Sequence, residues 1–313
     1  MKTFRICLVV TFTVLACFSK QETAQGLDYP NVPKDLDKES FCDKKDDRIY
    51  GHTVVVLDLT SKLKQAQIDY IGQIVFSEQF YTSYRPFTKF SYILINKNSP
   101  QSQQYVFSKC RPKTGTETEF KNPKDNSFFR KVFKNSADSS SADMPTSNES
   151  RTYVEKWWDK FIDHSKNAFK TVFKDKEIAE SEKSLIYETI ISIFRMPKLD
   201  FTSNYPERTL IIVSDMMQHS ERISFYDFCK TKGASKPNLC PKLDQLLSNS
   251  STKEYIKATS PNDKNNVNIK IIFLNNRYET NRSLDTSLIN LWIEYFEREG
   301  FKTPEVERQL DIM

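Results

Sequence analysis

The stretch 53-TVVVLDLTSKL-63 decides the fold of this chain. Five apolar or β-branched residues follow one another without polar alternation and lead into Asp58, after which come the hydroxyl of Thr60 and the ammonium of Lys62. A short apolar run without alternation is typical of a strand that is buried on both faces of a parallel sheet. The stretch therefore predicts a buried strand that delivers Asp58 to one edge of such a sheet.

Other runs of the chain extend this sheet. "RTLIIVSD" (208–215) and "VNIKIIFLNN" (267–276) are again short, apolar and rich in β-branched residues. "KFSYILINK" (89–97) alternates more and is followed by "QQYVFSKC" (103–110). Together these last two runs predict an antiparallel hairpin at the edge of the sheet.

Segments with helical periodicity separate the strands. They cover residues 63–80, 153–173, 181–196 and 283–301. Strands that alternate with helices are typical of α/β folds. The predicted fold class is therefore α/β, with a doubly wound, mostly parallel central sheet, an antiparallel edge hairpin and helices on both faces.

The first residues read as an export signal. "MKTFRICLVVTFTVLACFSKQETAQ" places two basic residues before an apolar stretch that is too short to span a bilayer as a mature helix. "VLAC" at its end resembles the lipobox of bacterial lipoproteins, in which Cys17 would be lipidated after cleavage. The alternative is an ordinary secretion signal that contains a cysteine, and in both cases the mature chain leaves the cytoplasm.

The remaining residues divide into a tether and one domain. Residues 1–17 are the predicted signal peptide, and 18–46 form a polar tether rich in Pro, Lys and Asp. Residues 47–313 form a single domain, with a low-complexity insert at about 122–150. We expect a periplasmic or cell-envelope lipoprotein that is held to the membrane by its lipid, with a soluble secreted protein as the alternative.

Four cysteines lie outside the signal, and an oxidising compartment favours their pairing in two disulfides, with three possible connectivities. Cys229 and Cys240 stand at the two ends of one loop that contains Gly and Pro, so we expect them to pair. Cys42 then pairs with Cys110. A four-cysteine zinc site is the competing interpretation, but the chain has no CxxC motif.

Charge and motifs exclude several functional classes. The net charge of +5 comes from 46 basic and 41 acidic residues spread along the chain, which does not favour a nucleic-acid partner. The 6 glycines form no phosphate-binding loop. Neither a GxSxG elbow nor an HExxH motif is present, and a dehalogenase-type phosphatase would need an acid where Thr60 stands. We therefore predict no catalytic residue.

Two predicted strands end in an acid at the same edge of the sheet. Asp58 and Asp215 come directly after apolar runs, and Thr60 adds a hydroxyl to the same region. Such oxygen ligands suit Mg²⁺, Mn²⁺ or Ca²⁺. The alternative is that both acids only cap the helices that follow them.

This pattern resembles the metal-ion-dependent adhesion site of von Willebrand factor A-type (vWA) domains. Asp58 and Thr60 match the first two positions of its Asp-x-Ser/Thr-x-Ser turn, and Asp215 matches its late aspartate. Ser184, which opens "SLIYETI", stands for the middle hydroxyl or is instead a routine helix cap. The resemblance implies that these four residues hold a divalent cation, directly or through water, and leave one position for a carboxylate of a partner protein.

Two residues depart from the family pattern. Lys62 occupies the second serine position, and Met216 replaces the glycine that usually follows the late aspartate. The Lys62 ammonium would take the place of the cation if it lies beside the acids, or else point to solvent. Gln218 and His219 follow in the loop above the sheet, at the ligand edge. We expect His219 to bond the neighbouring backbone, with contact to a ligand as the alternative.

The resemblance extends over about residues 50–301. "VVVLDLT", "YVFSKC", "LIIVSDMMQHS" and "LWIEYFEREGF" are similar to a group of poorly characterised exported bacterial vWA-like proteins. It implies a domain that binds another protein in the cell envelope. The alternatives are a metal-free scaffold in an envelope assembly of a secretion or conjugation type, and a divalent-metal hydrolase.

Overall fold

The computed structural model describes most of the predicted domain. The described residues are 37–42, 50–95, 105–114, 151–174, 183–197, 199–201, 205–229, 240–259, 264, 266–274 and 282–309. The chain divides into residues 1–34 and a unit from Asp35 to Met313, and only the second contains described residues. The predicted signal peptide, Cys17 and the insert at about 122–150 lie outside the described residues.

A mixed sheet forms the centre of this unit, in the order β3-β2-β1-β4-β5-β6. Its strands are β1 (Gly51–Asp58), β2 (Lys89–Ile95), β3 (Tyr105–Cys110), β4 (Glu207–Ser214), β5 (Val267–Phe273) and β6 (Glu305–Arg308). All neighbours pair in parallel except β2 and β3, which are antiparallel. The chain continues from β1 to β2 on one side, and β4 pairs with β1 on the other. The β1/β4 boundary is therefore the switch point, where doubly wound sheets bind ligands.

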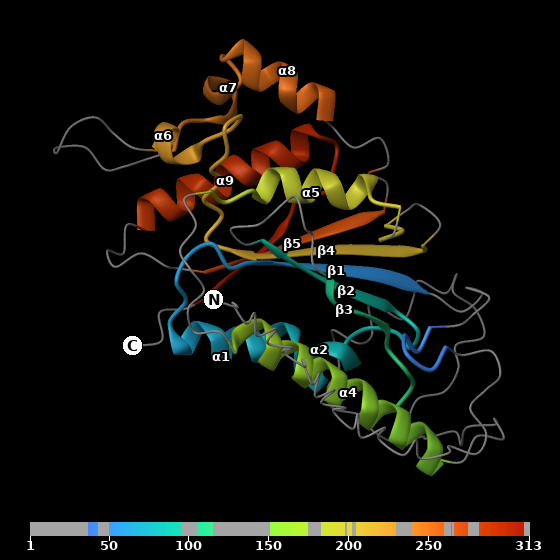
Figure 1. Cartoon of the computed structure of the whole chain (residues 1–313). Coiled ribbons are helices and arrows are strands. Elements are labelled where there is room, and N and C mark those ends of the chain that lie inside the picture. The colour runs from blue at the N-terminus through green and yellow to red at the C-terminus, as the bar shows by residue number, and fades with distance from the viewer. Residues whose placement is uncertain are drawn as a thin grey trace, which may run out of the picture. The chain divides into compact units, whose positions relative to one another are not determined.

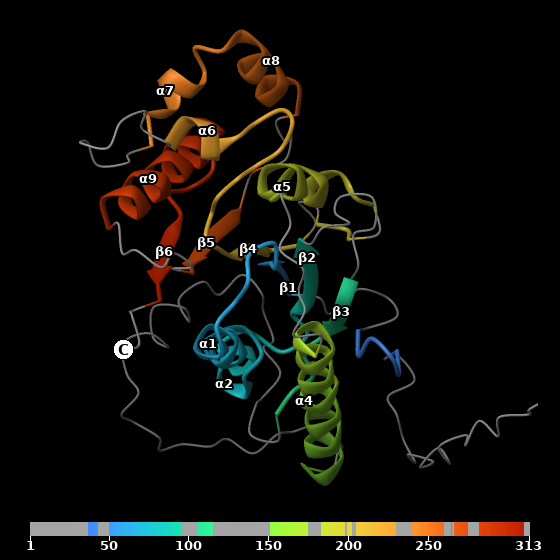
Figure 2. The ribbon, with the colours of Figure 1, turned by 60° about the vertical axis from the view of Figure 1, so that its left-hand side comes forward.

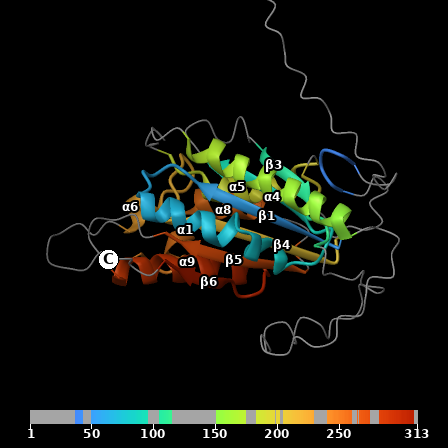
Figure 3. The same cartoon turned by 90° about the horizontal axis from the view of Figure 1, so that it is seen from below.

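Helices cover both faces of the sheet (Figures 1 and 2). One face carries α1 (Gln65–Val75), α2 (Glu78–Thr82) and α4 (Arg151–Phe173), and Figure 3 looks onto it. The other side carries α5 (Ile186–Arg195), α6 (Phe225–Cys229), α7 (Leu243–Leu246), α8 (Ser250–Thr259) and α9 (Arg282–Arg298). The predicted doubly wound fold with an antiparallel edge pair is confirmed.

The strand β1 is buried along its whole length, as its apolar run predicts. Val54 and Val56 belong to a cluster with residues of α5 and α9. Because strand side chains alternate, Val55 and Leu57 face the α1 and α4 side, and both are fully buried. Full burial of such a side chain contributes about 1.5–3 kcal/mol to stability, so β1 is held from both faces.

The face under α1, α2 and α4 is packed with aromatic rings. Tyr81 of α2 contacts Phe161 of α4 edge-on, with ring centroids 4.8 Å apart. Its hydroxyl lies 2.9 Å from the Tyr92 hydroxyl and 2.7 Å from Ser165 Oγ. The polar ends of these buried rings therefore have partners, and α4 is fixed to β2 by hydrogen bonds as well as by packing.

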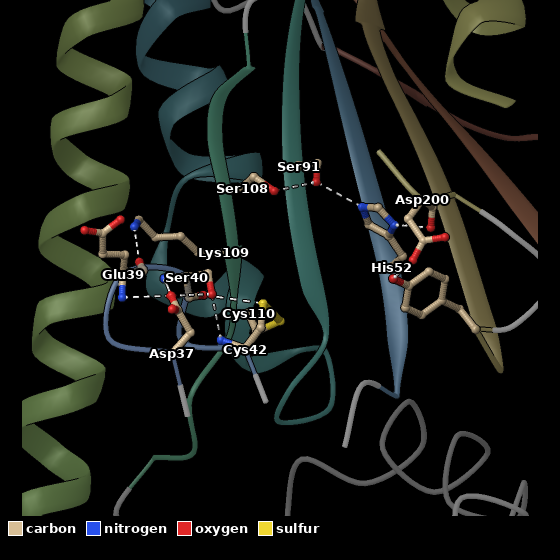
Figure 4. The surroundings of a disulfide bond; sticks show 11 residues. Asp37, Glu39, Ser40, Cys42, His52, Ser91, Ser108, Lys109, Cys110 and Asp200 are labelled. Atoms are coloured by element: carbon tan, nitrogen blue, oxygen red, sulfur yellow. Dashed lines mark hydrogen bonds between the residues drawn. A yellow bond between two sulfur atoms is a disulfide. The ribbon is translucent and has the colours of Figure 1, made fainter. Parts of the chain in front are cut away.

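Both predicted disulfides, Cys42–Cys110 and Cys229–Cys240, are confirmed. Cys42–Cys110 fastens the Asp37–Cys42 turn to the end of β3, where Cys110 N–H also donates to Ser40 O at 2.7 Å (Figure 4). Phe41 in this turn has a φ of 60° and its ring is buried against α4. The folded unit thus begins before residue 47, where the sequence places the start of the domain.

Two predicted helices have different bounds in the structure. The segment 63–80 is not one helix, because the chain breaks between α1 and α2, where Ser77 Oγ accepts the N–H of Phe80 at 3.1 Å and caps α2. The helix predicted over 181–196 begins only at Ile186, with Leu185 at its N-cap. Ser184 therefore does not cap this helix, and its hydroxyl has another partner.

A buried histidine connects β1 to β2 and to the chain before β4. His52 Nδ1 lies 3.4 Å from Asp200 O, and its Nε2 lies 2.9 Å from Ser91 Oγ (Figure 4). A carbonyl can only accept, so Nδ1 carries the proton and Nε2 accepts from the Ser91 hydroxyl. Burial, together with the nearby charge of Lys89, lowers the pKa of His52 to about 3.

This pKa predicts a loss of stability in mild acid. Below the ordinary histidine value of 6.5 the unfolded chain binds a proton at His52 and the folded chain does not, down to about pH 3. The free energy of unfolding should therefore fall by about 1.4 kcal/mol per pH unit in this range, relative to a His52→Gln variant. Urea unfolding of both proteins between pH 7 and 4 measures the difference, and parallel curves would contradict it.

Candidate functional site at the carboxyl edge of strands β1 and β4

The carboxylate of Asp58 is the centre of the site. It is 5% exposed, and each of its oxygens accepts two hydrogen bonds. Oδ1 accepts from Thr60 N at 3.1 Å and from Thr60 Oγ1 at 2.6 Å. Oδ2 accepts from Ser184 Oγ at 3.1 Å and from Ser214 Oγ at 2.7 Å. Three segments that are far apart in the sequence therefore meet at one side chain.

Ser214 connects the two acidic loops. Its hydroxyl donates to Asp58 and accepts the N–H of Met216 at 2.7 Å. Asp215, which lies between Ser214 and Met216 in the chain, accepts the N–H of Met217 at 3.0 Å through Oδ1. Met216 has a φ of 59°, in the left-handed region that glycine adopts most readily, and its carbonyl accepts from Trp292 Nε1 at 2.9 Å. The loop is thus fixed by bonds on both sides of the strained residue.

The second acid is bonded from the same turn as the first. Thr60 donates to Asp58, and the next residue, Ser61, donates from Oγ to Asp215 Oδ2 at 3.2 Å. Two adjacent hydroxyls of one turn therefore reach two carboxylates, one at the end of β1 and one directly after the end of β4. The acids lie on either side of the Thr60–Ser61 turn, at the β1/β4 boundary.

Neither acid caps a helix. Asp58 and Asp215 each accept the N–H of the residue two positions ahead, which is the pattern of a local turn. The helix after Asp58, α1, has Lys64 at its N-cap instead. The carboxylates therefore shape the loops at the sheet edge and do not begin helices.

Ser184 is joined to the loop after β4 by its backbone as well. Its N–H donates to His219 O at 3.0 Å, and its carbonyl accepts from His219 N at 2.8 Å, which forms an isolated antiparallel bridge. The ring of His219 lies with Nδ1 2.8 Å from Ser224 Oγ. The bridge places the Ser184 hydroxyl against Asp58, and the His219 ring is bonded to a side chain of its own loop.

Gln218 does not face the ligand edge, in contrast to the prediction. Its side chain is fully buried. Its Oε1 accepts the N–H of Tyr187 at 2.8 Å, and its Nε2 donates to Glu188 Oε2 at 2.9 Å. The amide therefore fastens the first turn of α5 to the loop after β4, and its role is structural.

Lys62 lies on the solvent side of the turn. Its side chain is exposed, and it forms no ion pair with Asp58 or Asp215 in the described part of the chain. The basic residue next to Ser184, Lys183, is paired with Glu221 at 2.7 Å on the surface. No ammonium group therefore stands beside the Asp58 carboxylate among the described residues.

The donor set fits a hard divalent cation. Thr60, Ser61 and Ser184 each donate their hydroxyl proton to a carboxylate, so the lone pairs of their oxygens remain to accept a cation. Carboxylate and hydroxyl oxygens are ligands that Mg²⁺, Mn²⁺ and Ca²⁺ use. Among the described residues no group of three or more His, Cys, Asp or Glu side chains could hold a metal ion, so a cation at this edge would depend on two carboxylates and on hydroxyl oxygens.

Comparisons with known proteins assign no family to this chain. A scan against family models gives no match, and a search of curated proteins gives none. Among solved structures the chain is similar to a von Willebrand factor type A protein from Catenulispora acidiphila, with 9% identity and a TM-score of 0.34. The similarity covers 84% of this chain and 39% of the other, so this chain spans well under half of that protein. The fold class follows from the strand order and helix layers of this chain itself.

Among the described residues, no helix combines the length and the apolar character that crossing a bilayer requires.

Ser214 provides a test of how the site is held together. A Ser214→Ala variant removes one of the four bonds to Asp58 and leaves the buried Met216 N–H without its acceptor. We expect the free energy of unfolding to fall by about 1–3 kcal/mol, the usual effect of an orphaned buried group. Denaturant unfolding measures it. Ser248→Ala, which changes a surface hydroxyl bonded to Gln245 O, should stay within about 0.5 kcal/mol of the wild type.

Proposed function

We propose that this domain binds another protein through the carboxyl edge of β1 and β4, with a divalent cation held there by Asp58, Thr60, Ser184 and Asp215. The observation that carries the proposal is the pair of edge carboxylates with hydroxyls that donate to them. The edge lies at the switch point of the sheet, where doubly wound folds bind ligands. The vWA resemblance of "VVVLDLT" and "LIIVSDMMQHS" points to the same edge.

The residues of the site have separate tasks in this proposal. Asp58 orients the hydroxyls of Thr60 and Ser184, because each donates its proton to that carboxylate. Asp215 adds the second negative charge from the neighbouring strand. A bound cation would supply a position for an oxygen ligand from the partner, such as a carboxylate. The apolar strands behind the acids exclude water from that side of the site.

One observation favours a second function, the metal-free scaffold. The Asp58 carboxylate already accepts two hydrogen bonds on each oxygen, so this buried group has its hydrogen-bond partners without a cation. In this form the edge would be a rigid structural junction of an envelope assembly. The Lys62 ammonium plays no part in it, because that side chain is exposed. A divalent-metal hydrolase on the same acids is the third candidate, and no described contact favours it.

Calorimetry separates the first two functions. The full chain, purified with its disulfides intact, is titrated with Mg²⁺, Mn²⁺ and Ca²⁺ after treatment with a chelator. We expect at least one ion to bind with measurable heat and to raise the melting temperature, since an ion that binds only the folded state stabilises it. Asp58→Ala should reduce the affinity more than tenfold, because it removes the charge that orients two hydroxyls.

A matched variant controls for a general change of charge. Asp159 is an exposed carboxylate on α4, on the face of the sheet under α1, and Asp159→Ala should bind the ion as the wild type does. If no ion gives heat or a thermal shift with the wild type, the cation-dependent function is excluded and the metal-free scaffold is retained.

We also propose that the chain is exported and lipid-anchored at Cys17, with its partner in the cell envelope. Two disulfides in the described domain support an oxidising compartment. The basic, apolar and polar order of the first residues supports a signal peptide that ends at "VLAC".

If the lipid is attached at Cys17, then membrane attachment depends on the sulfur of that residue. Cys17→Ser should abolish lipid attachment, so that the protein leaves the membrane fraction or accumulates as an unprocessed precursor. Metabolic labelling with a radioactive fatty acid, followed by fractionation, measures this. Cys7→Ser, within the apolar stretch, is the control and should be labelled normally. Equal labelling of wild type and Cys17→Ser would mean that the lipid is not on this residue.

A further inference from the structure

We infer that Ser61 supplies the second hydroxyl of the edge site, one position earlier than the family pattern places it. In that pattern the second serine stands at residue 62, where this chain has a lysine. The inference rests on the proposed function, because it assigns Ser61 to the cation site described there. It changes which residue of the turn would contact the ion.

The end of β1 determines where Ser61 lies. Leu59 N–H donates to Ile95 O at 2.9 Å, so the chain still runs along β2 one residue after Asp58. The bond from Thr60 N–H to Asp58 Oδ1 then turns the chain at Thr60 and Ser61. From this turn, Ser61 Oγ donates to Asp215 Oδ2 at 3.2 Å. Ser61 therefore reaches the loop that follows β4.

The hydroxyl of Ser61 has the same relation to Asp215 that the hydroxyl of Thr60 has to Asp58. Each donates its proton to a carboxylate, at 3.2 Å and 2.6 Å. An oxygen that has given its proton to a bond keeps its lone pairs for a cation. Ser61 is half-buried and so is held at the edge, whereas the next side chain is exposed.

Residue 62 is not placed to take this role. The Lys62 side chain is exposed and makes no ion pair with either acid in the described part of the chain. A serine at this exposed position would have a much shorter side chain than lysine. A hydroxyl introduced at position 62 therefore would not reach the carboxylates in this turn.

Four proteins test the assignment by Mn²⁺ binding, with the free ion measured by electron paramagnetic resonance and the heat by calorimetry. They are the wild type, Ser61→Ala, Ser61→Thr and Lys62→Ser, each as the full chain with its disulfides. We expect Ser61→Ala to weaken Mn²⁺ binding by about 10- to 100-fold, the range found when a group that holds or orients a metal ligand is removed. Ser61→Thr keeps the hydroxyl and should stay within about threefold of the wild type. Lys62→Ser should change the affinity by less than about threefold.

The melting temperature of each variant, measured in chelator, distinguishes a loss of metal binding from a folding defect. The melting temperature of each metal-free variant shows whether the turn is intact, and the Mn²⁺-dependent rise in melting temperature should be lost only in Ser61→Ala. If Ser61→Ala binds Mn²⁺ as tightly as the wild type, or Lys62→Ser tightens binding tenfold, the assignment to Ser61 is wrong while the proposed function stands. If the wild type binds no Mn²⁺, Mg²⁺ or Ca²⁺, the proposed cation site fails, and the assignment fails with it.

Discussion

The structure of the site depends on one buried carboxylate, that of Asp58. Its partners Ser184 and Ser214 are 126 and 156 residues away along the chain, and both bond the same oxygen. A carboxylate that is removed from water without such donors would destabilise the fold strongly. With two donors on each oxygen it becomes instead the point at which β1, β4 and the entry to α5 are joined. The positions of Thr60, Asp215 and His219 follow from that junction.

Because the site is built on buried strands, its geometry and the stability of the fold are linked. The residues that bury β1 on both faces also fix the position of Asp58 at the end of that strand. Gln218 and the Ser184–His219 bridge then hold the loops above it. A change in the core under this edge would shift the acids, because Asp58 is the last residue of β1 and Asp215 directly follows β4.

The sequence predicted the sheet well and the turns poorly, for physical reasons. Apolar β-branched runs mark buried strands, so β1, β4 and β5 were found within a few residues of their bounds. Glu305–Arg308 carries three charged residues, and its strand, β6, has no such signal. The break before α2 did have a signal in the sequence, because Ser77 stands three residues before Phe80, as a helix cap does. The helical periodicity of the surrounding residues obscured it. The spacing of residues indicates which of them follow a strand, but not the direction in which a turn points their side chains. The contacts of Ser61 and Ser214 were therefore not predicted, and Gln218 was predicted at the ligand edge.

The Asp37–Cys42 turn determines where a force applied to the chain before Asp37 would enter the sheet. A pull on the chain before Asp37 first meets a covalent bond to β3, through Cys42 and Cys110, and a ring, Phe41, seated against α4. The force therefore enters the sheet at its antiparallel edge through the disulfide, as well as along the main chain toward β1. The edge at β1 and β4, which carries Asp58, is separated from that point of entry by β2.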